Sequence, residues 1–272
     1  SAREKRLVIV PQITRLCRTS ACVVFRIKIN DCLPKFREEH KEEYEVIIDL
    51  ISFFSSLKDK FISKKASQQD IFLLSSIIEL DRLFQSAVLL LERGLSTPAN
   101  ITIRTILELS LNIVETIRNE EYIQTIIFDE ISEAYSTVNI AKDFNRLDLI
   151  PTEKIKEIQE VYDLLVTSNF KKKKSVKCLA QKNGFEVEYL LYRTYCSNTH
   201  ISASTLAKNF DFSSLGIAFD AGIQLDDFKN DLCRLISIVI ISAPSLIDDY
   251  FNDENLKKQY IFLCEKFETV FK

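Results

Sequence analysis

The sequence predicts an all-α protein, and three of its features carry that prediction. The 272 residues include only four glycines and five prolines, although β-rich folds use such residues at many tight turns. From residue 34 onward, apolar side chains recur every three or four positions, as they do on one face of a helix. The composition, 46% hydrophobic and 28% charged, is that of a globular chain with a buried core. We therefore expect a single domain of about eight antiparallel helices over residues 34–272.

Residues 1–33 have a different character. They are basic, with short apolar runs at residues 7–10 and 22–25, and these runs show no helical period. We expect a short irregular or β-like N-terminal arm, which need not belong to the helical fold.

The individual helices can be placed from apolar stripes and end signals. The clearest stripe runs over residues 73–91 and stops at Arg93-Gly94, where glycine suits a left-handed C-terminal position. The next helix is expected to begin at Thr97-Pro98, so the connection is tight and the two helices should pack antiparallel. Further helices are expected over residues 152–166, 228–246 and 256–270, and the most irregular stretch over Asp211 to Gln224.

The net charge of −3 divides unevenly along the chain. Residues 1–30 carry seven Lys/Arg and one Glu, which is +6, so the remaining residues carry −9. An acidic body does not indicate general nucleic-acid binding. Any RNA contact should therefore be local, for example at Lys171 to Lys174, and otherwise this run is a solvated loop.

Cofactor, metal and membrane signals are weak in this sequence. The seven cysteines form an odd number without a CxxC pair, as is typical of reduced cytosolic thiols. No glycine-rich phosphate loop or HExxH motif is present, so we expect neither a cofactor nor a metal. The longest uncharged apolar stretch, Leu235 to Ile247, contains Pro244 and is too short for a bilayer. We expect a cytoplasmic protein without a membrane contact.

The best candidate for chemistry is the pair Arg193 and His200. On a continuous helix the two residues share one face about 10.5 Å apart along the axis, so they cannot hydrogen-bond within one chain. Two copies related by a two-fold axis could bring them together. Alternatively the helix stops near Cys196, because Ser197 and Asn198 favour helix caps, and His200 opens the next helix.

The surroundings of this pair can also be predicted. A polar stripe of Glu186, Arg193, Ser197 and His200 is expected opposite an apolar face formed by Val187, Leu190 and Leu191. Arg104 and Glu108 lie one helical turn apart on an apolar helix, so we expect a partly buried ion pair that braces the Arg193 region or belongs to the site. His40, among four glutamates, is expected to be exposed and receives no role.

Such a pair is sufficient for RNA cleavage without a metal. A neutral imidazole can accept the proton of a ribose 2′-hydroxyl, and an arginine can hold the phosphate whose charge rises during attack. A structural alternative is that Arg193 pairs with Glu108 or Glu186, while His200 caps a helix.

Arg-x6-His on a late helix of an all-α chain resembles the Arg-x4-6-His motif of the HEPN superfamily. This resemblance implies a helical dimer with Arg193 and His200 as the catalytic pair, acting as a metal-independent RNase of a toxin–antitoxin or antiphage system. Tyr192, Ser197 and Asn198 would support that pair. Thr194 stands where active members often have Asn, Asp or His.

A longer resemblance is to an uncharacterised bacterial helical family, known only as a domain of unknown function. Its pattern of Arg-Gly-Leu, Arg-x3-Glu and Tyr-Arg-x6-His is similar to Arg93-Gly94-Leu95, Arg104 to Glu108, and Tyr192 to His200 in this chain. The similarity spans about residues 65–210 and implies no activity.

Two hypotheses follow. The first is a HEPN-like homodimeric endoribonuclease that takes RNA as its substrate. The second is a non-catalytic helical module that binds a protein partner, such as an antitoxin, and it is motivated by the acidic body, Thr194 and the missing phosphate loop.

Overall fold

The computed structural model describes residues 34–62, 67–167, 174–199, 210–213, 216–219 and 228–272. The predicted N-terminal arm, residues 1–33, lies outside them. A helical turn at residues 34–39 leads into the first long helix. The elements, in chain order, are α3 (Lys41–Ile62), α4 (Gln68–Leu91), α5 (Ser96–Arg118), α6 (Tyr122–Asp143), η1 (Leu147–Leu149), α7 (Thr152–Thr167), α8 (Val176–Asn183), α9 (Glu186–Thr199), β1 (Phe210–Ser213), β2 (Gly216–Phe219), α11 (Phe228–Val239), η2 (Ile240–Ser242), η3 (Ser245–Phe251) and α12 (Glu254–Val270). The all-α prediction is confirmed.

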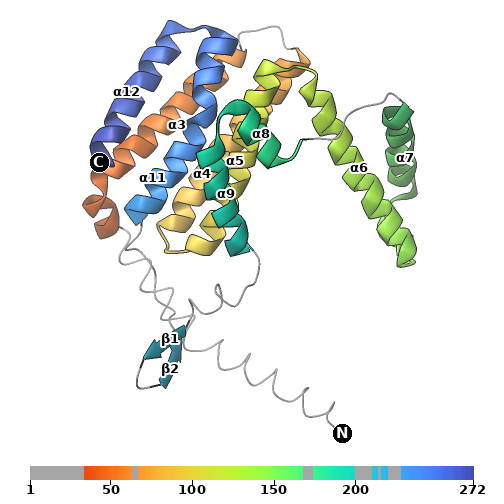
Figure 1. Ribbon diagram of the computed structural model, residues 1–272, viewed down its shortest axis with the longest axis horizontal. Helices are drawn as coiled ribbons and strands as arrows, with labels where there is room; N and C mark the ends of the chain where they lie inside the picture. The colour runs from red at the N-terminus through yellow and green to blue at the C-terminus, as the bar shows by residue number, and fades with distance from the viewer. Residues whose placement is uncertain (1–33, 63–66, 168–173, 200–209, 214–215, 220–227) are drawn as a thin grey trace.

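Helices α4 and α5 form the centre of the bundle. They pack against each other along their lengths, with α3 and α11 against α4, and with α8, α9 and α11 against α5 (Figure 1). The apolar stripe of α4 is buried as predicted, with Leu73, Ile77 and Phe84 fully shielded from solvent. On α5, Ile103 and Leu107 are equally buried. One continuous apolar core therefore joins these helices.

The ends of α4 follow local chemistry. Ser67 caps its N-terminus: its hydroxyl accepts a hydrogen bond from the Asp70 backbone N–H at 3.1 Å, and the Asp70 carboxylate accepts one from the Ser67 backbone N–H at 2.8 Å. At the other end Gly94 has a φ of 64°, so the predicted left-handed glycine is confirmed. The predicted N-cap at Thr97, with Pro98 as the first helical residue, was two residues late, because Leu95 occupies the N-cap position. Helix α5 begins at Ser96, and the backbone N–H of Ala99 already bonds to the Leu95 carbonyl.

Proline disrupts the last apolar segment of the core. Pro244 lacks an N–H to donate, and around it the chain passes from α11 through the 3-10 turn η2 into the π-helical η3. By length and composition alone this segment, Phe228–Phe251, could cross a membrane, with a mean hydropathy of 1.5. That is a weak indication, because a buried core helix passes the same test and 61% of the window is buried by the rest of the chain.

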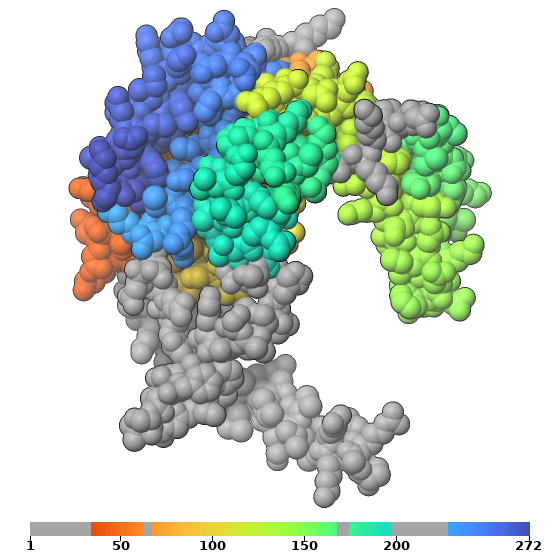
Figure 2. Space-filling view, viewed as in Figure 1, coloured from red at the N-terminus to blue at the C-terminus, as the bar shows by residue number. Residues whose placement is uncertain are grey.

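Helices α6 and α7 form a hairpin that extends away from the bundle (Figure 1). They are held together by the stacked rings of Tyr135 and Tyr162, whose centroids are 4.0 Å apart. Several large apolar side chains of the hairpin face solvent, including Phe144 at 73% and Leu149 at 65% exposure. The projection is also visible in the space-filling view (Figure 2).

A short β-hairpin lies within the stretch predicted to be the most irregular. Strands β1 and β2 pair antiparallel, with Phe210 opposite Phe219 and Ser213 opposite Gly216. Aromatic residues and Ile217 alternate along this stretch, and such residues favour strands even in a helical protein.

The central packing yields a prediction about stability. Phe84→Ala should lower the free energy of unfolding by about 3–5 kcal/mol, because it leaves a cavity at a fully buried ring. Urea denaturation followed by circular dichroism measures the change. Exposed Phe144→Ala is the matched control, and an equal loss in both variants would contradict the assigned core.

Candidate functional site

Helix α9 lies against α5 and is anchored by tyrosines. Tyr192 and Tyr195 are 8% and 4% exposed, while Arg193 and Thr194 face solvent. The predicted apolar face was partly wrong, because Val187 and Leu190 are 69% and 67% exposed and lie on the same outer side as Arg193. Both tyrosines bury an apolar ring on the inner face, and Tyr192 also uses its hydroxyl to bond to polar groups on α5. Only Leu191 of the three aliphatic residues packs against the core.

The Tyr192 hydroxyl connects two charged residues of α5. It donates to Glu108 Oε1 at 2.7 Å and accepts from an Arg104 guanidinium nitrogen at 3.2 Å. The expected Arg104–Glu108 ion pair also forms, at 3.3 Å, and both side chains are about one-third exposed. The Arg104 guanidinium carbon lies 5.2 Å from the Tyr192 ring centroid, within cation–π distance. These three residues fix the orientation of α9 on α5.

The pKa values of Tyr192 and Arg104 are both raised, in keeping with their roles as hydrogen-bond donors. Burial raises the pKa of Tyr192, and the hydrogen bond to Glu108 raises it further. The hydrogen bond to Tyr192 raises the pKa of Arg104. At neutral pH the phenol therefore keeps its proton, which it donates to the Glu108 carboxylate.

Arg193 lies on the outer, solvent-facing side of α9. The Arg193 side chain makes no hydrogen bond or ion pair with the residues that the structure describes, so the alternative of a pair with Glu108 or Glu186 is wrong. The backbone is helical through Thr199, so the alternative in which the helix stops near Cys196 is also wrong. Ser197 and Asn198 therefore belong to the helix. His200 lies outside the described residues.

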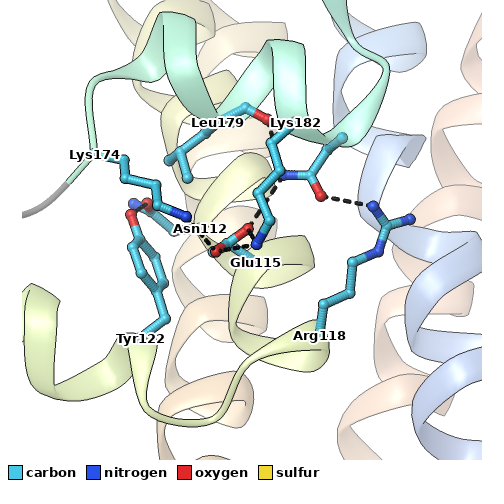
Figure 3. Close-up of polar contacts among 8 residues, drawn as sticks. Asn112, Glu115, Arg118, Tyr122, Lys174, Leu179 and Lys182 are labelled. Atoms are coloured by element: carbon cyan, nitrogen blue, oxygen red, sulfur yellow. Dashed lines mark hydrogen bonds and ion pairs between the residues drawn. The ribbon is translucent and has the colours of Figure 1, made fainter.

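A second polar cluster, which sequence reasoning missed, surrounds Glu115 at the other end of α5 (Figure 3). The Glu115 side chain is fully buried. Lys182 donates to both its oxygens, at 2.6 and 2.8 Å, and Lys174 donates to Oε1 at 3.3 Å. Arg118 donates to the Asn183 side-chain oxygen at 2.6 Å. Helix α8 is thus attached to α5 by a carboxylate shared between two lysines.

The lysines keep Glu115 ionised. Burial by itself would raise the pKa of this carboxyl group, but the hydrogen bonds and charges of Lys182 and Lys174 outweigh burial and lower it. The sequence signal for this cluster was a glutamate near the end of an apolar helix, and it did not identify the lysines 59 and 67 residues away.

His40 and Glu92 lie in contacts at the N-terminal part of the bundle. His40 is not exposed as expected: its side chain is 24% exposed and its ring lies 4.6 Å from that of Phe36. Buried Glu92, beside the predicted Arg93-Gly94-Leu95 anchor, forms an ion pair with Arg37 at 3.0 Å and also accepts a hydrogen bond from Tyr44. The Arg37 ion pair attaches the first helical turn to the end of α4, and the Tyr44 hydrogen bond attaches α3 to the same carboxylate.

No group of three or more His, Cys, Asp or Glu side chains that could hold a metal ion occurs in the described part of the chain. The α5–α9 face presents an exposed arginine, Arg193, on a helix that the group of Arg104, Glu108 and Tyr192 holds in place.

Comparison with known proteins places this domain. A model of a family of unknown function, DUF5677, matches residues 70–217, which is more than half of the chain. The protein belongs to this family. The match runs from α4 to β2 and includes Arg104, Glu108 and Tyr192. No curated protein and no solved structure matches the chain. The predicted resemblance to an uncharacterised domain is thus confirmed, and the family carries no assigned activity.

The two buried tyrosines of α9 should respond differently to loss of their hydroxyls. Tyr192→Phe removes bonds to two charged groups and should cost about 1–2 kcal/mol. The Tyr195 hydroxyl is buried and has no hydrogen-bond partner among the residues that the structure describes, so Tyr195→Phe should be neutral or stabilising by up to about 1 kcal/mol at pH 7. Urea denaturation of both variants measures the difference.

Tyr195 also has a pH signature. Burial raises its pKa from 10.0 to about 12, so its contribution to stability is complete below pH 10 and is lost as the pH rises toward 12. Tyr195→Phe should therefore reduce the loss of stability over this interval. A loss as steep as that of the wild type would contradict the assigned burial.

Glu115 gives a prediction at acid pH. Its folded pKa is lowered from 4.5, so its contribution is present above pH 4.5 and is lost as the pH falls through the folded value. Glu115→Gln should cost about 1–2 kcal/mol at pH 7, a modest figure because both lysines reach water. The variant should then lose less stability than the wild type between pH 5 and about pH 3. Exposed Glu130→Gln is the control, and parallel pH profiles of wild type and Glu115→Gln would contradict the prediction.

Proposed function

We propose that this protein is a HEPN-like, metal-independent endoribonuclease that acts as a homodimer through Arg193 and His200. By the same resemblance, it would act in the cytoplasm of a bacterium in a toxin or antiphage setting. Tyr192, Ser197, Asn198, Arg104 and Glu108 would support the catalytic pair.

The observation that carries this proposal is the position of Arg193. Its neighbour Tyr192 is held by Arg104 and Glu108, so the helix that bears Arg193 is fixed on α5. The guanidinium itself faces solvent and has no partner among the described residues. The solvent-facing guanidinium on this fixed helix is available for a phosphate, which it can bind through two parallel N–H donors.

The proposed reaction needs only two side chains and the substrate. The neutral imidazole of His200 takes the proton of a ribose 2′-hydroxyl, and the 2′-oxygen attacks the adjacent phosphorus. The bond from phosphorus to the 5′-oxygen breaks, and that oxygen takes a proton from the imidazolium. Arg193 stabilises the charge that develops on the non-bridging phosphate oxygens. The products are a 2′,3′-cyclic phosphate and a 5′-hydroxyl.

The proposal requires two copies of the chain. Helix α9 continues from Arg193 to Thr199, a rise of about 9 Å, and in this proposal each catalytic pair is completed across the dimer rather than within one chain. Val187 and Leu190, on the same outer side as Arg193, are apolar and solvent-exposed. Their burial against the α9 helix of a second copy would favour association and bring Arg193 of one chain near His200 of the other.

Cleavage of a cellular RNA pool in excess EDTA tests the function. Arg193→Ala and His200→Ala should each lower the rate at least about 100-fold, because each removes a group that acts in the transition state. Arg82→Ala is the matched control, since Arg82 is an exposed helical arginine that pairs only with the neighbouring Glu79. The new 3′ ends of the products are identified by a treatment that opens a 2′,3′-cyclic phosphate to a monophosphate.

Two results would contradict the proposal. The first is no cleavage by folded wild-type protein in either its monomeric or its dimeric fraction. The second is cleavage that EDTA abolishes, or that both site variants retain.

A second candidate function is a non-catalytic assembly module, and the α6–α7 hairpin favours it. Apolar side chains gather at the far end of the hairpin and are exposed there: Ile140 (52%), Phe144 (73%), Leu147 (37%) and Leu149 (65%). Exposed apolar groups on a projecting element are typical of contact surfaces. Under this alternative wild-type protein cleaves nothing, and Phe144→Ser lowers its mass in sedimentation.

Under this alternative, the exposed apolar end of the hairpin would bind the hairpin of a second copy of the chain. The base of the hairpin, residues 122–134 and 158–167, carries five acidic residues and no basic one, whereas residues 135–157 carry four of each. Antiparallel pairing places each acidic base beside the neutral end of its partner, and so avoids the repulsion of two acidic bases.

A further inference from the structure

We infer that Lys174, Lys177, Lys182 and Arg118 form a binding site for the phosphate backbone of single-stranded RNA. The inference rests on the proposed function for the identity of the ligand, and it adds a substrate-binding surface separate from Arg193. Residues 171–183 contain six lysines and no acidic residue, although residues 31–272 carry a net charge of −9. Such a local excess of positive charge on an acidic body is a typical electrostatic footprint of nucleic-acid binding.

The fold brings three of these cations, Lys174, Lys182 and Arg118, together around Glu115. The bonds from Lys174 and Lys182 end on the same Glu115 oxygen, at 3.3 and 2.6 Å, so the two ammonium groups are close neighbours. The Arg118 guanidinium joins them through Asn183, whose amide nitrogen lies 3.5 Å from the other Glu115 oxygen. Figure 3 shows Lys174, Lys182 and Arg118 arranged around the buried carboxylate.

The cluster keeps an excess of positive charge. Glu115 supplies one negative charge against Lys174, Lys182 and Arg118, and Asn183 is neutral. Lys177, on the first turn of α8, is exposed and forms no ion pair with the residues that the structure describes. The Lys174 and Lys182 side chains are 41% and 43% exposed, so their ammonium groups can contact both Glu115 and a ligand in solvent.

The N-terminus of helix α8 adds positive potential to this cluster. Helix α8 begins after Ser175, and the positive end of its dipole lies between Lys174 and Lys177. In the space-filling view α8 lies on the surface with α9, on the side of the bundle that faces the hairpin (Figure 2). A polyanion can therefore approach the lysines directly.

The distance to the proposed catalytic helix suits a short strand of RNA. Arg104, which holds α9 through Tyr192, and Glu115 are eleven residues apart on α5, a rise of about 16 Å. Domains that bind single strands engage roughly 4–16 nucleotides, so one strand can contact both places. Lysine ammonium groups bind phosphates as point charges and read no base, as an RNase of broad specificity requires.

Binding of an uncleavable oligonucleotide tests this site without reference to catalysis. Full-length protein is titrated in EDTA with a fluorescent 2′-O-methyl RNA of mixed sequence over a range of salt concentrations. Lys174→Gln/Lys177→Gln should weaken binding at least about tenfold at low salt. In a plot of the logarithm of the binding constant against the logarithm of the salt concentration, the slope should become shallower. The expected change is about 0.7 for each phosphate that the variant no longer neutralises. Lys154→Gln/Lys156→Gln on α7 is the matched control, with the same change of charge, and should bind like the wild type.

A further variant tests whether weaker binding arises only because the Lys174 substitution disturbs the Glu115 ion pairs. Lys177→Glu leaves both lysine bonds of Glu115 in place, so its fold should be intact and its RNA binding should still fall. Three results would overturn the inference: no binding by wild type, equal weakening in the α7 control, or competition by polyglutamate as effective as by RNA, which would indicate an acidic protein partner. If wild-type protein binds RNA but never cleaves it, only the proposed function fails.

Discussion

The burial of helix α5 is the constraint on which the rest of the fold depends. Helices α4, α8, α9 and α11 all pack against it, and six of its apolar residues are fully shielded from solvent: Ile103, Ile106, Leu107, Leu111, Ile113 and Val114. A helix surrounded in this way must be apolar on most sides, so a carboxylate on it needs a charged or hydroxyl partner to offset the cost of burial. The polar residues of α5 thereby determine where α8 and α9 attach.

Two carboxylates of α5 perform this attachment by different means. Glu108 is shared by Arg104 of its own helix and the Tyr192 hydroxyl of α9, whereas Glu115 is fully buried and is bound by Lys182 and Lys174. Paired charges below the surface add little net stability, but they penalise every arrangement in which one partner is missing. The orientations of α8 and α9 are therefore specific, and the cations at their outer surfaces occupy fixed positions.

The family boundaries agree with this division of the fold. The match to the family of unknown function covers residues 70–217, so it includes α5 together with the helices that its carboxylates hold. Helices α3, α11 and α12 lie outside the match and complete the apolar core. The residues proposed to act on RNA thus belong to the family domain, and the flanking helices supply burial.

The sequence by itself determined the helical class, the buried stripe of α4, the left-handed Gly94 and the Arg104–Glu108 pair. Each is a relation between residues at most a few turns apart, and the geometry of a single helix fixes it. Only the tertiary structure decided that Leu190 is exposed while tyrosines fill the inner face of α9, and that Glu115 meets lysines 59 and 67 residues away. Contacts over such separations depend on how whole helices pack. Helical periodicity predicts which face of a helix is buried, but it does not predict which other helix covers that face.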